Sequence, residues 1–83
     1  MKMNVYSVLD KAVGAFLQPF FSPAKAAAIR SFGDAVNDAG HQFNKHMADY
    51  VLYELATFED ASGLIVSYEP VRVISALECK VES

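Results

Sequence analysis

The chain has 83 residues, of which 53% are hydrophobic and 20% charged, and its formal net charge is −3. This length corresponds to one domain, residues 1–83, and the composition is too apolar for intrinsic disorder, which requires low hydrophobicity together with high net charge. The acidic balance is also the reverse of the basic excess that drives nucleic-acid binders onto phosphate, so any DNA contact would need a local basic patch or a protein partner.

The first residues of the chain and its single cysteine suggest a soluble cytoplasmic protein. Residues 1–9 mix polar with apolar side chains, unlike the unbroken apolar block of a signal peptide. No apolar run approaches the roughly 18–20 residues that are needed to span a bilayer. Cys79 has no partner for an internal disulfide, and we expect a reduced, half-buried core thiol.

The first third of the chain predicts two extended segments. Residues 3–9 alternate between two faces and are rich in residues that favour strands. Residues 15–18 form a second segment, which ends at Pro19 because proline cannot donate a hydrogen bond to a strand ladder. Phe20 and Phe21 follow, and we expect both to be core anchors at the entry to a helix.

An amphipathic helix is predicted from Ser22 to about residue 38. Ser22 suits the N-cap, and Pro23 suits the first helical position, where its missing N–H costs no hydrogen bond. Gly40 is the predicted C-terminal stop. One face of this helix is apolar and is expected to pack on a sheet; it consists of Ala28, Ile29, Phe32, Ala35 and Val36.

The second half of the chain predicts three further strands. Residues 41–49 are polar and are expected to be irregular, whereas residues 50–58 form the clearest strand. Residues 59–63 have the composition of a hairpin turn, and residues 64–68 form the returning strand. After a short break, residues 71–79 alternate as a last strand.

These elements together predict an α+β fold: a mostly antiparallel sheet of four to five strands with one amphipathic helix packed on one face. The strand at residues 50–58 carries large apolar side chains on both faces, and one helix cannot cover both. Either loops or a second subunit must cover the other face, and pairing through the C-terminal edge strand is a further route to assembly. We therefore expect a homo-oligomer, most simply a dimer, with an interface formed by Tyr53, Leu55, Val73 and Leu77.

No recognisable catalytic or cofactor motif occurs in the sequence, whether a phosphate loop, a dinucleotide fingerprint, a nucleophile elbow, a zinc-protease helix or a cysteine pair. His41 and His46 lie near Asp38 and Asp49, but their spacing matches no standard metal site, which favours solvated loop residues. Asp34 and Asp38 are one helical turn apart and are best explained as a solvated helix face. We predict that the chain is not an enzyme and that it needs no metal or cofactor.

Cationic and aromatic side chains are the candidates for contact with nucleic acid or with a protein partner; they are Lys25, Arg30, Tyr6, Lys45 and Arg72. Lys25 lies near the predicted helix N-terminus, where the helix dipole favours anions. Arg30 projects from the helix side opposite the core, where it can pair with Asp34, contact a phosphate or contact a partner. Tyr6 belongs to the strand aromatics on which single-stranded DNA binders stack bases, although aromatics at strand spacing are more often core residues.

Four features of the chain, taken together, resemble one family. They are the segment NVYSVLDKA, the segment FLQPFF followed by AIRSF, the phrase HQFNKHMADYVLYELATFED, and the turn DASG before a short strand. In this combination the chain resembles the small nonstructural protein, the fifth open reading frame product, of gokushovirus-type microviruses and related single-stranded DNA phages. The most specific stretch is residues 49–53 running on to residue 60. The family often has a proline before Asp49, where this chain has Met47 and Ala48, and this departure affects the local turn.

The resemblance implies a role around viral DNA replication and the packaging of single-stranded DNA into procapsids, in the host cytoplasm and away from membranes. It implies phage replication or procapsid proteins as partners, and it supplies no catalytic residues. Two hypotheses follow. One is a non-enzymatic accessory factor that acts through protein contacts. The other is a direct single-stranded DNA-binding protein that uses strand aromatics and scattered Lys and Arg, which a steep salt dependence of binding would reveal.

Overall fold

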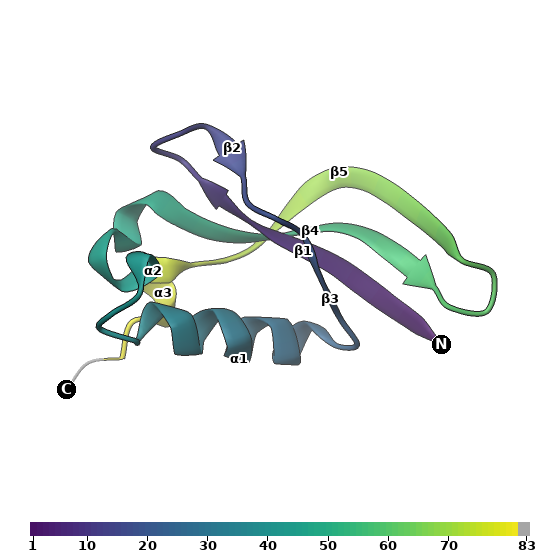
Figure 1. Cartoon of the computed structure of the whole chain (residues 1–83), viewed down its shortest axis with the longest axis horizontal. Coiled ribbons are helices and arrows are strands. Elements are labelled where there is room, and N and C mark those ends of the chain that lie inside the picture. Colours follow the sequence, from purple (N-terminus) through teal and green to yellow (C-terminus); the bar gives the residue numbers. More distant parts are fainter. Residues whose placement is uncertain (82–83) are drawn as a thin grey trace.

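The computed structural model describes residues 1–81 (Figure 1). Along the chain, the elements are β1 (Lys2–Asp10), β2 (Ala15–Phe16), β3 (Phe20–Ser22), α1 (Lys25–Val36), α2 (Gln42–Lys45), the 3₁₀ helix η1 (Met47–Asp49), β4 (Tyr50–Glu59), β5 (Leu64–Ser75) and α3 (Ala76–Cys79). Every strand pairing is antiparallel. Helix α1 lies along one face of the sheet (Figure 1), which confirms the predicted α+β fold.

The sheet has the strand order β2-β1-β4-β5, and β3 is a further partner of β1. Strands β1 and β4 are central and pair along their whole length, from Lys2 opposite Glu59 to Asp10 opposite Tyr50. Strands β2 and β3 share the other side of β1, one after the other. Within the described residues, β5 pairs with β4 alone and so forms the opposite edge of the sheet.

The β1–β2 and β4–β5 connections are the same kind of turn. In each, a glycine N–H donates to the carbonyl of an acidic residue four positions earlier, Gly14 to Asp10 and Gly63 to Glu59, both at 2.8 Å. The two glycines have φ angles of 75° and 74°, which residues with a Cβ rarely adopt. Each acidic side chain also accepts a hydrogen bond from the backbone N–H two residues later. The predicted hairpin at residues 59–63 is therefore confirmed.

A bulge bends the sheet near the middle of β4. Glu54 pairs with Val71 and Ala56 pairs with Ser67, so β5 places three residues opposite the single residue Leu55. Extra residues of this kind bend a strand and release it from regular hydrogen bonding, which accommodates Pro70 inside β5. The predicted break before residue 71 is therefore wrong as a strand end, because β5 continues through it.

Helix α1 begins later than the sequence predicts, at Lys25 instead of Pro23. Ser22 pairs with Asn4 in the β1–β3 ladder, and its hydroxyl donates to the carbonyl oxygen of Ala24 at 2.9 Å. The serine hydroxyl therefore serves the strand-to-helix connection, and Ala24 occupies the N-cap position without a side-chain cap. The strand pairing outweighs the intrinsic capping preference of serine.

Asn37 ends α1 and ties it to the C-terminal segment. Its Nδ2 donates to the carbonyl oxygens of Gly33, at 2.8 Å, and Cys79, at 2.9 Å. Its Oδ1 accepts a hydrogen bond from the backbone N–H of Val81 at 3.0 Å. The predicted stop at Gly40 is wrong, because the helix has already ended at the asparagine cap.

The last predicted strand ends early, because residues 76–79 form helix α3. The hydroxyl of Ser75 accepts from the backbone N–H of Glu78 at 3.2 Å, and the Glu78 carboxylate accepts from the backbone N–H of Ser75 at 3.1 Å. This reciprocal capping box stabilises a helix start, and it overrides the alternating pattern that predicts a strand through residue 79. The region at residues 41–49, predicted as irregular, contains α2 and η1.

The core lies between α1 and the sheet. The predicted apolar face of the helix is confirmed, with Ala28, Phe32 and Val36 buried, while Tyr6 and Leu52 are fully buried on the facing strands. The cluster of buried residues is Tyr6, Val8, Ala28, Phe32, Val36, Tyr50, Leu52 and Ala76. These side chains form one apolar layer between α1 and the central strands β1 and β4.

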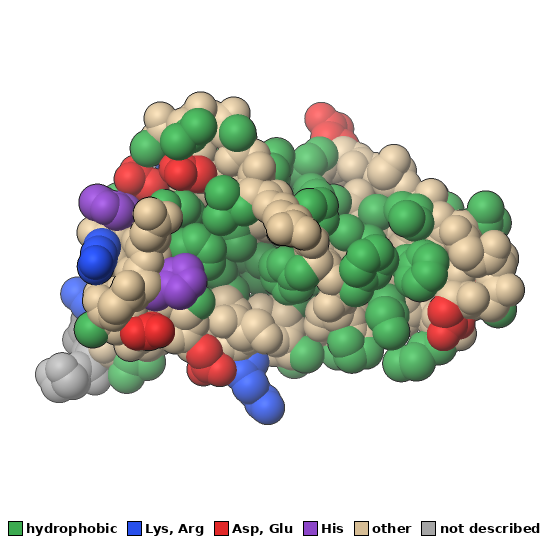
Figure 2. All heavy atoms as spheres, in the orientation of Figure 1, with side chains coloured by type: hydrophobic (Ala, Val, Ile, Leu, Met, Phe, Trp, Pro, Cys, Tyr) green, Lys and Arg blue, Asp and Glu red, His purple; other side chains and the backbone are tan. Residues whose placement is uncertain are grey.

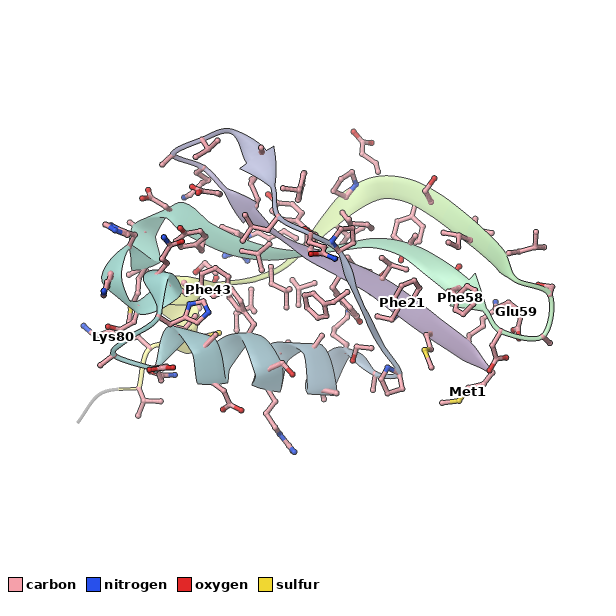
Figure 3. The ribbon with its side chains drawn as sticks, in the orientation of Figure 1. Met1, Phe21, Phe43, Phe58, Glu59 and Lys80 are labelled. Atoms are coloured by element: carbon pink, nitrogen blue, oxygen red, sulfur yellow. The ribbon has the colours of Figure 1, made fainter. Side chains whose placement is uncertain are left out.

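Beyond the N-terminal end of α1 the sheet continues as an arm, formed by residues 1–5 and 55–67 (Figure 1). The chain is elongated, with extents of 43 × 26 × 18 Å and a radius of gyration of 13.2 Å, whereas a compact chain of this length would have about 12 Å. At the tip of the arm, the N-terminal amine of Met1 binds the carboxylates of Glu59, at 3.1 Å, and Asp60, at 2.6 Å (Figure 3). These ion pairs hold the start of β1 against the β4–β5 turn.

Candidate protein-contact surface

His41 is a helix cap, a role that the sequence pattern did not indicate. Its Nδ1 accepts a hydrogen bond from the backbone N–H of Phe43 at 3.1 Å, which starts α2. The ring centroids of His41 and Phe43 lie 4.4 Å apart. His46 is exposed. Among residues 1–81 there is no group of three or more His, Cys, Asp or Glu side chains that could hold a metal ion.

The described helices are also too short or too polar to cross a membrane: none of those within residues 1–81 reaches the required length and hydropathy.

Tyr6 is a core residue, so its predicted contact with nucleic acid is wrong. Its side chain is completely buried, and its ring stacks on Phe20 with a centroid distance of 5.9 Å. The hydroxyl accepts a hydrogen bond from Asn4 Nδ2 at 3.2 Å, and burial raises the pKa of the Tyr6 hydroxyl. A base cannot stack on a ring that is enclosed between the sheet and its neighbours.

The four cationic candidates are spread over three elements. Lys25 begins α1, Arg30 lies on the exposed side of α1, and Lys45 ends α2. Arg72, on β5, forms an ion pair with Glu78 of α3. On the face of the molecule that Figure 2 shows, the Lys and Arg side chains are isolated and form no continuous basic patch. The electrostatic affinity for DNA depends on several phosphates being neutralised together, which separated cations do not provide.

The residues predicted for an oligomer interface do not share one surface. Tyr53 is half-buried with its ring edge-on to Phe16, at a centroid distance of 5.4 Å. Val73 packs against the core, and Leu55 is half-buried at the bulge. Among these predicted residues, Leu77 is the exposed one, at 58%, and it lies on α3. The set therefore cannot act as a single contact surface.

Away from the arm, the chain itself closes the sheet face opposite α1. Ser7 and Val51 are buried on this face, and the Ser7 hydroxyl donates to the carbonyl oxygen of Leu17 at 2.6 Å. Figure 1 places β2 on the same side of the sheet, away from α1. The sequence predicts that either a loop or a second subunit covers this face. Away from the arm, a loop of the chain itself covers it.

The arm carries an exposed apolar patch on this same face. Directly opposed residues in an antiparallel ladder share a face, and Met3 opposes Phe58, which opposes Ile65. Val5 lies two residues along β1 from Met3, and it opposes Phe21. We refer to Met3, Phe21, Phe58 and Ile65 as the arm patch.

Phe21 and Ile65 are the most exposed members of the arm patch, at 52% and 58%. The rings of Phe21 and Phe58 meet edge to face with centroids 5.4 Å apart (Figure 3). The prediction that Phe21 is a core anchor is therefore wrong, whereas Phe20 packs against the core as predicted. An exposed aromatic pair that is already held in place is a typical anchor for a binding partner.

The other face of the sheet has a fixed polar network where the arm leaves the helix. Glu54 accepts hydrogen bonds from Asn4 Nδ2, at 3.3 Å, and from the Tyr68 hydroxyl. Burial, together with this bond to Glu54, raises the pKa of Tyr68 to about 12, so its hydroxyl remains a donor at neutral pH. The network joins β1, β4 and β5 and thereby fixes the base of the arm.

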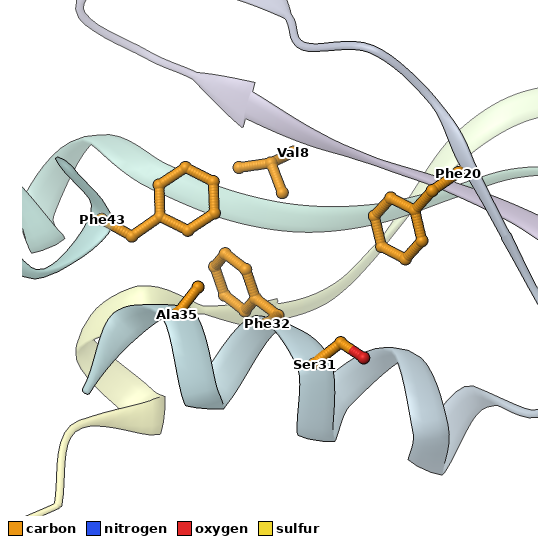
Figure 4. A pocket seen from close by; sticks show the side chains of 6 residues that line it. All are labelled: Val8, Phe20, Ser31, Phe32, Ala35 and Phe43. Carbon is orange, nitrogen blue, oxygen red and sulfur yellow. The ribbon is translucent and has the colours of Figure 1, made fainter. Parts of the chain in front are cut away.

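An apolar hollow of about 170 Å³ opens between α1 and the sheet (Figure 4). Its lining consists of Val8, Phe20, Ser31, Phe32, Ala35 and Phe43. The hydrophobic floor is also visible in the space-filling view (Figure 2). The volume is comparable to that of cavities that accept a benzene-sized group.

A family model described as phage ORF5 protein matches residues 3–79 of the chain. The matched stretch runs from β1 to the end of α3 and contains both the arm patch and the hollow. No curated protein and no solved structure gives a significant match.

Proposed function

The chain belongs to the phage ORF5 protein family, and from this premise we propose a non-enzymatic accessory factor in the replication and packaging of single-stranded phage DNA. It acts through contacts with phage replication or procapsid proteins. The proposed source is a gokushovirus-type microvirus, and the proposed location is the host cytoplasm. The observation that carries the proposal is the arm patch, a group of apolar side chains on the arm that includes the exposed residues Phe21 and Ile65.

The charge around the arm patch favours a protein partner. Residues 1–5 and 55–67 carry two positive groups, the Met1 amine and Lys2, and two negative groups, Glu59 and Asp60. The Met1 amine is bound by both carboxylates. The hydrogen bond to Asp60, and then that to Glu59, raises the pKa of this amine. The arm is therefore close to neutral, and burial of apolar surface is the main force available for binding there.

Replacing Phe21 with Ser is expected to weaken capture of the phage partner about 30-fold or more, the usual effect of losing an aromatic anchor from the centre of an interface. The measurement is a pull-down, with titration of the tagged protein, against the phage replication initiator and against procapsids at native salt. Leu77→Ser is the matched control, because it removes a similarly exposed side chain, 58% against 52%, from α3 instead of the arm.

Two results would contradict the proposal. If the wild-type chain captures neither the initiator nor procapsids, protein contact with these partners is wrong. If Phe21→Ser weakens capture no more than Leu77→Ser does, the arm patch is not the centre of the contact. Circular dichroism of both variants checks that each retains the fold.

Direct binding of single-stranded DNA is the second candidate, and the exposed Phe21–Phe58 ring pair favours it because bases stack on such rings. The neutral charge of the arm opposes it. Fluorescence anisotropy with a labelled oligonucleotide, at about 50 mM and at physiological salt, separates the two candidates, because phosphate contacts weaken steeply with salt. We expect no binding at either salt. Binding that falls with salt and is lost in Phe21→Ser would replace the protein-contact proposal.

A further inference from the structure

Strand β5 is an edge without the usual protection against pairing. Within residues 1–81 it pairs with β4 alone, so its outer side presents backbone N–H and C=O groups. Natural sheets block such edges with charged side chains or proline. Residues 64–68 contain neither, and Glu69, Pro70 and Arg72 come only at and beyond the bulge.

The opposite edge of the sheet differs in this respect. It consists of β2, with two residues, and β3, with three, and Pro19 lies between them. Edge strands as short as these offer little template for another strand. The β5 edge is thus the side of the sheet where a further strand can add.

Side chains on both faces of this β5 segment are exposed. Leu64 is 64% exposed, and Ile65 and Val66 are each 58% exposed. Three consecutive apolar residues in this state are unusual on a soluble monomer unless the surface binds something. The arm on which they lie also projects from the body of the molecule (Figure 1).

We propose that two copies of the chain form a homodimer by antiparallel pairing of their β5 edges along residues 64–68. A two-fold axis perpendicular to the sheet brings identical edge strands together in this orientation, so each strand pairs with its own copy. An apolar, uncharged segment is complementary to itself in such a pairing. The arm as a whole is near neutral, so the net charge of −3 on each chain is not concentrated where the copies meet.

This pairing also determines where the arm patches lie. Because the two-fold axis is perpendicular to the sheet, corresponding faces of the two copies stay on the same side. The two arm patches then form one apolar face across the joined sheets. The dimer does not depend on the proposed function, since β5 pairing requires no phage partner.

The interface is expected to be small. Stable specific interfaces cover about 800 Å² of each partner, against a total surface of 5253 Å² for this chain. A five-residue strand edge is expected to cover less than this, as in weak, transient complexes, so we expect a dissociation constant of about 1–50 µM. The dimer should form at laboratory concentrations and dissociate on dilution.

Val66→Lys tests the edge directly, because a lysine near the centre of the pairing places two like charges close together. Light scattering after size exclusion, from about 0.5 to 500 µM to bracket the expected affinity, should give twice the 9.1 kDa chain mass for the wild type at the upper end. Val66→Lys should remain at the monomer mass. Val13→Lys is the matched control, the same change at a residue that is 74% exposed in the β1–β2 turn, and it should still dimerise.

Cysteine cross-linking tests the orientation without assuming a register. Single cysteines are placed in a Cys79→Ser background, one variant for each position from 64 to 68, with Val13→Cys as the control. At the centre of an antiparallel pair the two copies of a residue lie about 4.5–5.5 Å apart, within reach of a disulfide, whereas two positions away they are about 14 Å apart. We expect oxidised dimer to peak at one or two adjacent positions and to be low for Val13→Cys.

A wild-type chain that stays monomeric over the whole concentration range would overturn the dimer. A Val66→Lys variant that still dimerises, or a cross-linking profile that is flat across residues 64–68, would place the contact elsewhere on the chain. Circular dichroism of Val66→Lys separates loss of pairing from loss of folding, since Val66 already lies in water and its replacement should leave the spectrum unchanged.

Discussion

Replacing Leu52 with Ala is expected to lower the free energy of unfolding by about 2–5 kcal/mol, the range for leucine truncation in a packed core. Leu52 is fully buried on the central strand β4, between Val8 on β1 and Ile74 on β5. Truncation removes contacts with both neighbouring strands and leaves a cavity beneath α1. Because a chain of 83 residues has a total stability of only about 4–12 kcal/mol, this one change removes a large part of it.

Urea denaturation followed by circular dichroism measures this loss, at a protein concentration low enough to keep the chain monomeric. Leu77→Ala is the matched control, since Leu77 is 58% exposed on α3 and its truncation should change stability by less than about 0.5 kcal/mol. Equal effects of the two substitutions would show that Leu52 is not the centre of the core.

The predictable parts of the fold are those where burial of an element determines how its apolar residues are spaced along the chain. Helix α1 buries Ala28, Phe32 and Val36 against the sheet, so its apolar residues recur at helical spacing. Strand β4 lies in the centre of the sheet, and its large apolar side chains identify it in the sequence. In these elements local preference and tertiary burial agree, and the prediction is confirmed.

Two predicted element boundaries proved wrong because a second signal, long-range in one case and local in the other, overrides the first. Ser22 has the composition of an N-cap, but long-range pairing with Asn4 recruits it into β3. Residues 71–79 alternate like a strand, but the Ser75–Glu78 capping box starts a helix inside that pattern. The Ser-x-x-Glu spacing was visible in the sequence. The pairing of Ser22 was not, because it depends on residues far away in the chain.

The candidate surface was harder to predict than the fold. Phe20 and Phe21 are adjacent, and in a strand adjacent side chains point to opposite faces, so both could not enter one core. That signal indicates that one of the two phenylalanines lies outside the core, but it does not tell which one. Phe58, the partner of Phe21, could not have been found in the same way, since their contact depends on the registers of β3 and β4 against β1. The burial of Tyr6 could not be predicted either, because it depends on which face of the sheet α1 covers.

Replacing Phe32 with Ala is expected to lower the free energy of unfolding by about 3–5 kcal/mol, as for other buried phenylalanines. Phe32 is 3% exposed, and it is the largest of the fully or nearly buried side chains that α1 presents to the sheet. The centroid of its ring lies 5.5 Å from that of Phe43, and the ring forms one wall of the hollow (Figure 4). Truncation enlarges this hollow, which is open to solvent, and removes the largest buried side chain that α1 contributes to the core.

Hydrogen exchange should resolve this effect by element. Because β1 and β4 pair along their whole length, their amides should keep part of their protection in Phe32→Ala, whereas α1 amides should exchange close to the unprotected rate. Ser31→Ala is the matched control, since Ser31 neighbours Phe32 on α1, lines the same hollow and is exposed. It should change stability by less than about 0.5 kcal/mol and leave α1 protected. Equal loss of protection in α1 and in the central strands would mean that the helix and the sheet unfold as one cooperative unit, with Phe32 stabilising both.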